Sequence, residues 1–365
     1  MKDLFFKEPN TRWKGLLAAA AILFALSGLL WLDGAGEGPI CRLLYPQFSV
    51  FMIKYLGRLS SLVPFSLFES AMTVTVLAAL VHLVRVVRSR KGFLRWLCGC
   101  LVIAAWLTFS FVCFWGVNHF GDDLYTKTGL TPTDYDKQDL YNAGLYAIEQ
   151  ANRLAEALPK TEAGGIDMPS FHELADQAQS GFTKVCENYP ALPFPANRPK
   201  PLLYTPLYSY TGFTGFIFAF TGESCVSRNT YPSALPLTMT HELSHAIAVA
   251  SEDEANFLGF LACLENESLY FQYSAWYHAY CWCSNSLLKI DSELGWELVS
   301  RCSEAFAADL RATNAHYRPY DGKVQEAAQQ VNDAYLKFYK EEAGVESYDR
   351  AVSYYVNWYL AGCPL

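Results

Sequence analysis

Three long apolar stretches near the start of the chain constrain its fold more than any other feature. They cover residues 15–32, 65–87 and 97–117, and each can cross a bilayer as a helix of about twenty residues. A hydrophobic content of 52% with only 18% charged residues agrees with a chain that lies partly in lipid. We therefore predict a membrane anchor with three transmembrane helices over residues 1–117, followed by a globular domain over residues 118–365.

Basic residues flank these stretches unevenly. They precede the first stretch and separate the second from the third: Lys2, Lys7, Arg12, Lys14, Arg88, Arg90, Lys91 and Arg95. Because basic loops stay in the cytoplasm, we expect a multi-pass protein of the cell (cytoplasmic) membrane with its N-terminus in the cytoplasm and residues 118–365 extracytoplasmic. The first stretch is predicted to be an uncleaved anchor, since no small-x-small cleavage site precedes Asp33.

The anchor also contains polar positions. Residues 34–64 mix basic with apolar side chains, so we expect this segment to rest on the outer membrane surface without spanning it. Glu69 and His82 lie near the two ends of the second stretch, where we expect both side chains to be solvated at an interface.

Charge and cysteine content exclude some classes of function. The net charge is −8 and basic residues gather only beside the membrane stretches, so no nucleic-acid partner is expected. The eleven cysteines are interpreted as buried thiols or structural disulfides. Cys281 and Cys283 are too closely spaced for a zinc knuckle.

The globular part has the pattern of a mainly α domain with a small sheet. Apolar residues at helical spacing predict helices over residues 136–158, 170–189, 252–265, 269–290, 292–310, 324–342 and 348–360. Residues 212–221 alternate bulky aromatic with small side chains and predict a strand or hairpin. This strand either pairs with an extended substrate by edge addition or is a buried aromatic strand without such a role.

The sequence His241-Glu242-Leu243-Ser244-His245 predicts a metal site. Side chains four residues apart share a helix face, so His241 and His245 can bind one zinc ion (Zn²⁺) while Glu242 serves as general base. A catalytic zinc keeps three protein ligands and one open position. A second string, His172 to Asp176, begins the same way but has aspartate in place of the second histidine, so it is interpreted as ordinary helix surface.

Glu252 and Glu254 compete as the third metal ligand. Glu254 lies three residues after Ser251 and is expected to form a capping box with it. Glu252 shares one helix face with Asn256, Gly259 and Cys263, a polar and small stripe that would pack closely against the metal-binding helix. We therefore favour Glu252 as the ligand, with Asn256 orienting a ligand from behind, and keep Glu254 as the alternative and Glu223 as a fallback.

Stabilisation of the oxyanion needs a hydrogen-bond donor from another helix. The candidates within reach in sequence are Tyr273, Tyr277 and His278. The sequence does not separate them, and each is interpreted as a packing residue in preference to a donor, as are His119 and His316.

The segments 220–223, 241–245 and 252–257 together resemble an uncharacterised family of bacterial membrane proteins with an extracytoplasmic HExxH domain. Residues 63–67 and 347–348 are similar to that family too. The resemblance implies a zincin-like α+β fold and a predicted zinc peptidase without an established substrate. Glu252 and Asn256 are also similar to the Glu-x-x-x-Asp element of glutamate zincins. Ala248 departs from the family pattern, which commonly has glycine there, and this affects the turn after the second histidine.

Two functions remain for this chain. The first is a membrane-anchored zinc metallopeptidase that hydrolyses peptides or proteins near the lipid bilayer. The alternative is a non-catalytic membrane sensor or scaffold with a zincin fold. The intact Glu242 favours the enzyme, because a binding-only protein has no need of a general base.

Overall fold

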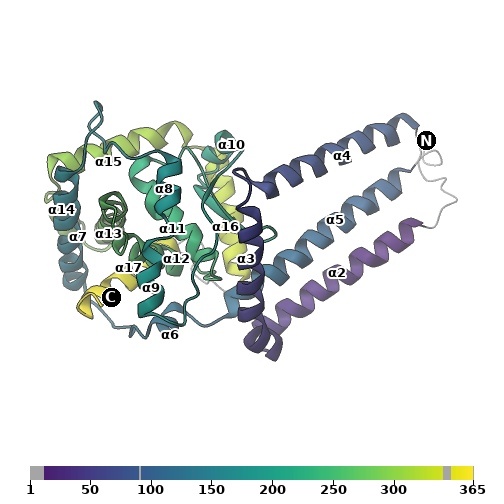
Figure 1. Ribbon diagram of the computed structural model, residues 1–365, viewed down its shortest axis with the longest axis horizontal. Helices are drawn as coiled ribbons and strands as arrows, with labels where there is room; N and C mark the ends of the chain where they lie inside the picture. Colours follow the sequence, from purple (N-terminus) through teal and green to yellow (C-terminus); the bar gives the residue numbers. More distant parts are fainter. Residues whose placement is uncertain (1–11, 90–91, 340–346, 365) are drawn as a thin grey trace.

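Three helices project from one side of a rounded helical body in the computed structural model (Figure 1), which describes residues 12–89, 92–339 and 347–364. The projecting helices are α2 (Arg12–Ala35), α4 (Leu67–Ser89) and α5 (Phe93–Phe114). All three are long and apolar enough to cross a membrane. The prediction of three membrane-spanning stretches is confirmed to that extent, while Lys2, Lys7, Arg90 and Lys91 lie outside the described residues.

The described segment between α2 and α4 contains no helix long and apolar enough to cross a membrane. It forms a short π-helix, η1 (Ile40–Leu44), and then α3 (Tyr45–Ser60). Figure 1 shows α3 lying across the base of the projecting helices, against the body. Ile53 of α3 is buried beside Trp115, whereas Phe51 and Leu59 are exposed. Helix α3 thus joins the anchor to the body along its edge.

The body is organised around α13 (Leu269–Ile290), which is seen end-on in Figure 1. Around it lie α7 (Lys137–Ala157), α11 (Leu235–His245), α12 (Glu252–Leu264), α14 (Ser292–Val299) and α17 (Ser347–Leu360). Their shared core is rich in buried aromatic side chains such as Phe260, Phe271 and Tyr355. The expected mainly helical domain with a small sheet is therefore confirmed.

The shorter elements fill the periphery. They are η2 (Gly116–Phe120), α6 (Leu124–Thr128), α8 (Phe171–Gln177), α9 (Gly181–Asn188), α10 (Thr205–Ser209), η3 (Pro232–Ala234), α15 (Glu304–Tyr317), η4 (Arg318–Tyr320) and α16 (Lys323–Phe338). The string from His172 lies on α8, where His172 and Glu173 are exposed, so its interpretation as helix surface is confirmed.

Two predicted helices are broken in the structure. The predicted helix 170–189 splits into α8 and α9, because Gly181 lies directly against the backbone carbonyl of Ala262 and the chain must turn to allow it. The predicted helix 292–310 splits into α14 and α15, where the Ser303 side chain caps the new helix by accepting the Phe306 N–H at 3.3 Å. The end of the predicted helix 324–342 lies outside the described residues.

The sheet has three strands in the order β1-β3-β2. Strand β1 (Lys200–Pro201) pairs parallel with β3 (Glu223–Val226), and β2 (Gly215–Phe218) pairs antiparallel with it. The strand or hairpin predicted over residues 212–221 is confirmed as one strand, β2, whose hairpin partner β3 begins just beyond that range. Every residue of β3 is buried, while β2 forms one edge of the sheet.

Two carboxylates fasten α4 to the body. Glu223 accepts the N–H groups of Leu67 and Phe68, the first residues of α4, at 2.9 and 3.0 Å, and forms an ion pair with Lys200 at 2.7 Å. In return, Glu69 of α4 accepts the Leu203 N–H at 2.9 Å. The expectation of a solvated Glu69 is therefore wrong: its side chain is 3% exposed because body backbone amides replace the water.

All eleven cysteines are free thiols. Disulfide bonds therefore play no part in holding the described residues together.

Candidate metal centre

Helix α11 places the two histidines. It has proline in its first turn, where the missing N–H costs nothing, and it continues to His245. The rings of His241 and His245 lie with their centroids 4.5 Å apart, one helical turn from each other. Both therefore face the same side of α11.

A tight reversal follows His245. Ala248 donates its N–H to the His245 carbonyl at 2.9 Å and Val249 donates to the Ser244 carbonyl at 3.3 Å. Ala248 has φ +65°, in the left-handed region, which favours glycine. The family commonly has glycine at this position, and in this chain Ala248 adopts the left-handed conformation that the turn requires.

Helix α12 then returns closely against α11. A Cβ atom on Gly259 would lie 2.9 Å from the His241 backbone nitrogen, so only glycine allows this approach. The Thr240 hydroxyl donates to the Gly259 carbonyl at 3.0 Å and lies 3.2 Å from the Cys263 sulfur. The predicted close packing through the small-residue stripe is confirmed.

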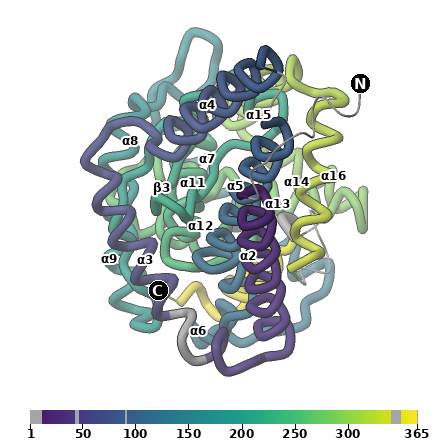
Figure 2. The backbone as a smooth tube through the Cα atoms, turned by 90° about the vertical axis from the view of Figure 1, so that its right-hand side faces the viewer, coloured from purple at the N-terminus to yellow at the C-terminus, as the bar shows by residue number. Residues whose placement is uncertain are grey.

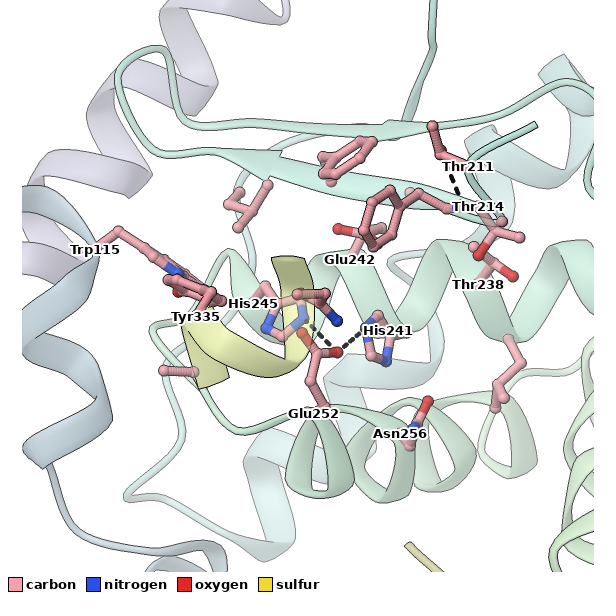
Figure 3. Close-up of a pocket in the computed structure, with 18 of the residues that line it drawn as sticks. Trp115, Thr211, Thr214, Thr238, His241, Glu242, His245, Glu252, Asn256 and Tyr335 are labelled. Atoms are coloured by element: carbon pink, nitrogen blue, oxygen red, sulfur yellow. Dashed lines mark hydrogen bonds and ion pairs between the residues drawn. The ribbon is translucent and has the colours of Figure 1, made fainter. Parts of the chain in front are cut away.

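Glu252 meets both histidines as a result (Figure 3). Its Oε2 lies 3.2 Å from His241 Nε2 and 3.5 Å from His245 Nε2. Ligand atoms about 2.0–2.2 Å from a tetrahedral zinc ion are separated by about 3.3 Å. His245 Nδ1 donates to the Val249 carbonyl at 2.7 Å, so Nε2 is the nitrogen that would bind a metal ion in place of a proton. The three side chains therefore fit a zinc ion by donor type, spacing and tautomer.

The charges of this cluster are tightly coupled. Burial raises the pKa of Glu252, but His245 and His241 outweigh it, so the net shift is downward and Glu252 is a carboxylate. Burial lowers the pKa of His241. Burial also acts to lower the pKa of His245, but the adjacent Glu252 outweighs it and raises the value to about 9. The buried Glu252 carboxylate thus favours the positively charged form of His245.

Glu242 lies above the cluster, beneath the β-hairpin (Figure 3). Its side chain is buried, and its Oε2 has no hydrogen-bond partner among the described residues. Burial raises the pKa of Glu242 to about 8. Gly215 of β2 lies so close to Glu242 that a larger residue would collide with its carboxyl group. Glu242 is therefore a carboxyl group of raised pKa held between the candidate metal ligands and an edge strand.

The other acids considered lie elsewhere. Glu254 accepts the Leu124 N–H at 2.8 Å and the Tyr354 hydroxyl at 3.2 Å. The predicted capping box is wrong, because Asp253 bonds both the Ser251 hydroxyl and the Glu254 N–H and Glu254 is left to bond α6 and α17. Glu223 bonds the first residues of α4 and Lys200, as described above. Asn256 lies beside His241 in the pocket (Figure 3).

The cluster opens into a cavity of about 720 Å³. One wall is α11 and α12, and the hairpin forms a second wall through Gly215, Phe216 and Ile217. The remaining walls come from distant segments: Phe111 and Trp115 from the end of α5, and Gln329, Asn332 and Tyr335 from α16. The end of a helix long and apolar enough to cross a membrane thus lines the pocket.

A family model described as a protein of unknown function, DUF3810, matches residues 43–356. The chain belongs to this family. Neither a curated protein nor a solved structure matches it. The matched range begins at the junction with α3 and includes α4, α5 and every pocket residue named above. The expectation of an uncharacterised family over most of the chain is confirmed.

The predicted oxyanion donors occupy different places in this DUF3810 member. The Tyr273 hydroxyl donates to Asp309 at 2.7 Å and the Tyr277 hydroxyl bonds Thr313 at 3.0 Å, both away from the metal centre. His278 lines the pocket. Burial lowers its pKa to about 4, and its Nδ1 donates to the Ser274 carbonyl at 2.8 Å. Its Nε2 then presents a lone pair, which accepts and does not donate.

Tyr335 and Trp115 are the pocket residues that sequence reasoning missed. The Trp115 indole N–H donates to the Tyr335 hydroxyl at 3.0 Å, and His119 Nε2 lies 3.0 Å from the same oxygen. The Trp115 ring lies edge-on to His245, with centroids 5.3 Å apart. A tryptophan at the end of an apolar span and a tyrosine on an amphipathic helix are the only local signals. His316 bonds the Asn229 carbonyl at 2.7 Å, away from the pocket.

Proposed function

We propose that this protein is a membrane-anchored, zinc-dependent metallopeptidase with a zincin-like body. The observation that carries the proposal is the meeting of His241, His245 and Glu252 beside a buried Glu242 whose Oε2 faces no partner among the described residues. The combination of two histidines and one carboxylate is that of catalytic zinc sites with an open position.

His241, His245 and Glu252 would hold the zinc ion. When bound, zinc polarises a carbonyl group and lowers the pKa of water to near neutrality. Glu242 takes a proton from the attacking water on its free oxygen and delivers it to the leaving amine. The raised pKa of Glu242 suits both transfers, because a stronger base accepts the proton readily and its acid still releases it.

Two further walls of the pocket have roles in this proposal. The β2 edge binds an extended substrate backbone by strand addition next to Glu242. Tyr335, on the α16 wall, lines the same pocket (Figure 3) and is proposed to supply the hydrogen bond to the developing oxyanion. Trp115 and His119 hold that hydroxyl in place.

The body is proposed to lie outside the cytoplasm. The supporting observation is the basic sequence before the first span and between the second and third. A reporter fused at Asn118 is expected to behave as extracytoplasmic. Cytoplasmic behaviour of that reporter overturns the orientation.

The decisive experiment compares metal content and hydrolysis. Purified wild-type protein is expected to hold about one zinc per chain, and His245→Ala is expected to lose zinc and activity. Glu242→Gln should retain the zinc and lose hydrolysis of a casein substrate, since the amide cannot accept the proton. Glu267→Gln, an exposed position after α12, is the matched control and should resemble wild type.

The same variants test the alternative of a non-catalytic sensor. If Glu242→Gln and wild type hold zinc equally and neither hydrolyses any substrate, the sensor replaces the peptidase. If wild-type protein purified without chelator contains no transition metal, both readings of the site fail.

A further inference from the structure

The geometry points to a substrate class: a polypeptide anchored in the same membrane, with its anchor on the N-terminal side of the bond that is cut. The inference rests on the proposed function for the hydrolytic step. Its own basis is where the pocket lies and which way the β2 edge runs.

The first step is that the pocket opens beside the membrane. Phe111 and Trp115 belong to a helix long and apolar enough to span a bilayer, and both line the metal-centre cavity. Tryptophan at the end of such a span lies at the level of the lipid head groups. The metal centre is therefore within one side chain of the membrane surface, because the Trp115 ring contacts His245.

The second step is that the body rests on the bilayer on both sides of the spans. Figure 2 looks along the projecting helices. It shows α3 on one side of the pair formed by α2 and α5, and α16 on the other side of that pair. Each carries exposed apolar side chains, Phe51 and Leu59 on α3 and Val331 and Phe338 on α16. The Phe338 ring also stacks on Trp31 of α2, with centroids 4.9 Å apart. A soluble polypeptide must therefore approach a pocket that is flanked by lipid, whereas an anchored one is already there.

The third step is that the β2 edge presents backbone groups to the cavity. Ser227 donates its N–H to the Thr214 carbonyl at 2.7 Å, so these two residues form a hydrogen-bonded pair of the antiparallel ladder. Such pairs alternate with pairs that are not hydrogen-bonded to each other, in which the N–H and C=O groups of each residue point away from the partner strand. Gly215 and Ile217 thus direct their N–H and C=O groups away from β3, and both residues line the cavity.

The fourth step is the direction of β2, whose C-terminal end lies against α4 and α5. Its last residue, Phe218, stacks on Phe68 of α4 with centroids 4.4 Å apart, and Phe220 stacks on Trp106 of α5 at 6.3 Å. Ahead of its N-terminal end, the Tyr210 ring contacts Tyr320 of η4 at 5.3 Å.

A second cavity, of about 430 Å³, extends the pocket at the N-terminal end of β2 and is lined by Tyr317, Tyr320 and Gln325. The groove therefore has one end beside the spans α4 and α5 and another end beside η4.

The polarity of the substrate follows from these steps. An antiparallel strand exchanges both hydrogen bonds with a single outward-facing residue and pairs slightly more strongly than a parallel one. A chain added antiparallel to β2 runs, from its N-terminus to its C-terminus, from the spans α4 and α5 towards η4. A membrane anchor beside these spans then precedes the residue at Glu242, and the released C-terminal part leaves through the second cavity.

The test uses the full-length protein in lipid vesicles with one disordered casein segment presented in three forms. The segment follows an N-terminal single span, precedes a C-terminal single span, or carries no span. Confinement to the membrane raises the local concentration, so the N-terminally anchored form should be cut at least about tenfold faster than the free form. Cut sites should stay at a constant distance from the span when the linker is lengthened.

A binding readout accompanies the rates. Glu242→Gln with a photo-crosslinking side chain at Phe216 should capture the N-terminally anchored form in preference to the other two. Equal cutting of free and anchored forms overturns the inference and leaves the peptidase intact. Preference for the C-terminally anchored form overturns the polarity.

Capture without cutting by wild type removes the proposed hydrolysis and retains the substrate class. Neither capture nor cutting of any form overturns both.

Discussion

The two walls of the metal-centre pocket are built in opposite ways. The wall of α11 and α12 is buried and joined by a glycine contact between backbones, with Gly259 against His241. The wall of α16 has a single buried residue within the helix, Leu336, and apolar Val324 and Val331 exposed on its outside. The comparison teaches that the geometry of the candidate metal ligands is set by dense local packing, while the opposite wall, proposed to face substrate, is held by a few long-range contacts.

The largest effect is expected when the Glu252 carboxylate is removed from the densely packed wall of α11 and α12. Glu252→Ala should lower zinc affinity by more than about a hundredfold, since even residues behind a metal ligand contribute ten- to a hundredfold. Glu254→Ala is the control two residues away. It should destabilise the fold by about 1–3 kcal/mol by leaving the Leu124 N–H unpaired, while zinc affinity of the folded protein is unchanged. Zinc titration of both variants decides, and the opposite pattern would reverse the ligand assignment.

The α16 wall is tested by its hydroxyl group. Tyr335→Phe should reduce kcat by about a hundredfold with zinc content unchanged, as expected for loss of one oxyanion donor. Tyr339→Phe is the matched control one turn later, because Tyr339 does not line the pocket. An unchanged kcat for Tyr335→Phe would remove this residue from the mechanism.

The glycine contact of the dense wall is tested by adding one methyl group. Gly259→Ala places a Cβ against the His241 backbone, and overpacking of this kind costs about 1–3 kcal/mol. Zinc affinity should fall with it, because His241 is displaced. Gly99→Ala in α5 meets open space and is the control. Thermal unfolding that is equal for both variants would show that the two helices can separate without cost.

The smallest effect is expected at the turn between the two helices. Ala248→Gly relieves a left-handed alanine, which costs about 1–2 kcal/mol, and glycine returns part of that through unfolded-chain entropy. A net gain of up to about 1 kcal/mol in the free energy of unfolding should result. Ala246→Gly, at φ −65°, should instead destabilise. A loss of stability in Ala248→Gly would mean that the turn is not strained.

The sequence was sufficient for the dense wall because the evidence there is local. His241 and His245 are one turn apart, and the stripe of Glu252, Asn256, Gly259 and Cys263 gave both the close packing and the facing carboxylate. The left-handed turn at Ala248 coincides with the position at which glycine was expected. Helical periodicity also located the spans and most helices of the body.

The predictions from sequence were wrong or incomplete where a residue far along the chain determines the contacts of a side chain or the end of a helix. Glu254 has the spacing of a capping box, yet a backbone amide on α6 bonds it. Glu69 looks solvated until the turn at Leu203 covers it. The break before α9 depends on the carbonyl of Ala262, and Tyr335 reaches the pocket only because α16 packs against the end of α5. None of these partners leaves a periodic pattern in the sequence.

The hydrogen bonds from the start of α4 to Glu223 join segments that are synthesised at different times. Leu67 and Phe68 emerge from the ribosome before Lys200 and Glu223, so the N–H donors at the start of α4 are present before the carboxylate that accepts them. Without the start of α4, Glu223 would lose two of its donors and remain as a buried charge beside Lys200, a situation that disfavours closing the sheet. The start of α4 thus stabilises β3, and through β3 the edge strand over Glu242. A chain in which α4 is displaced is therefore expected to lose the order of that edge strand.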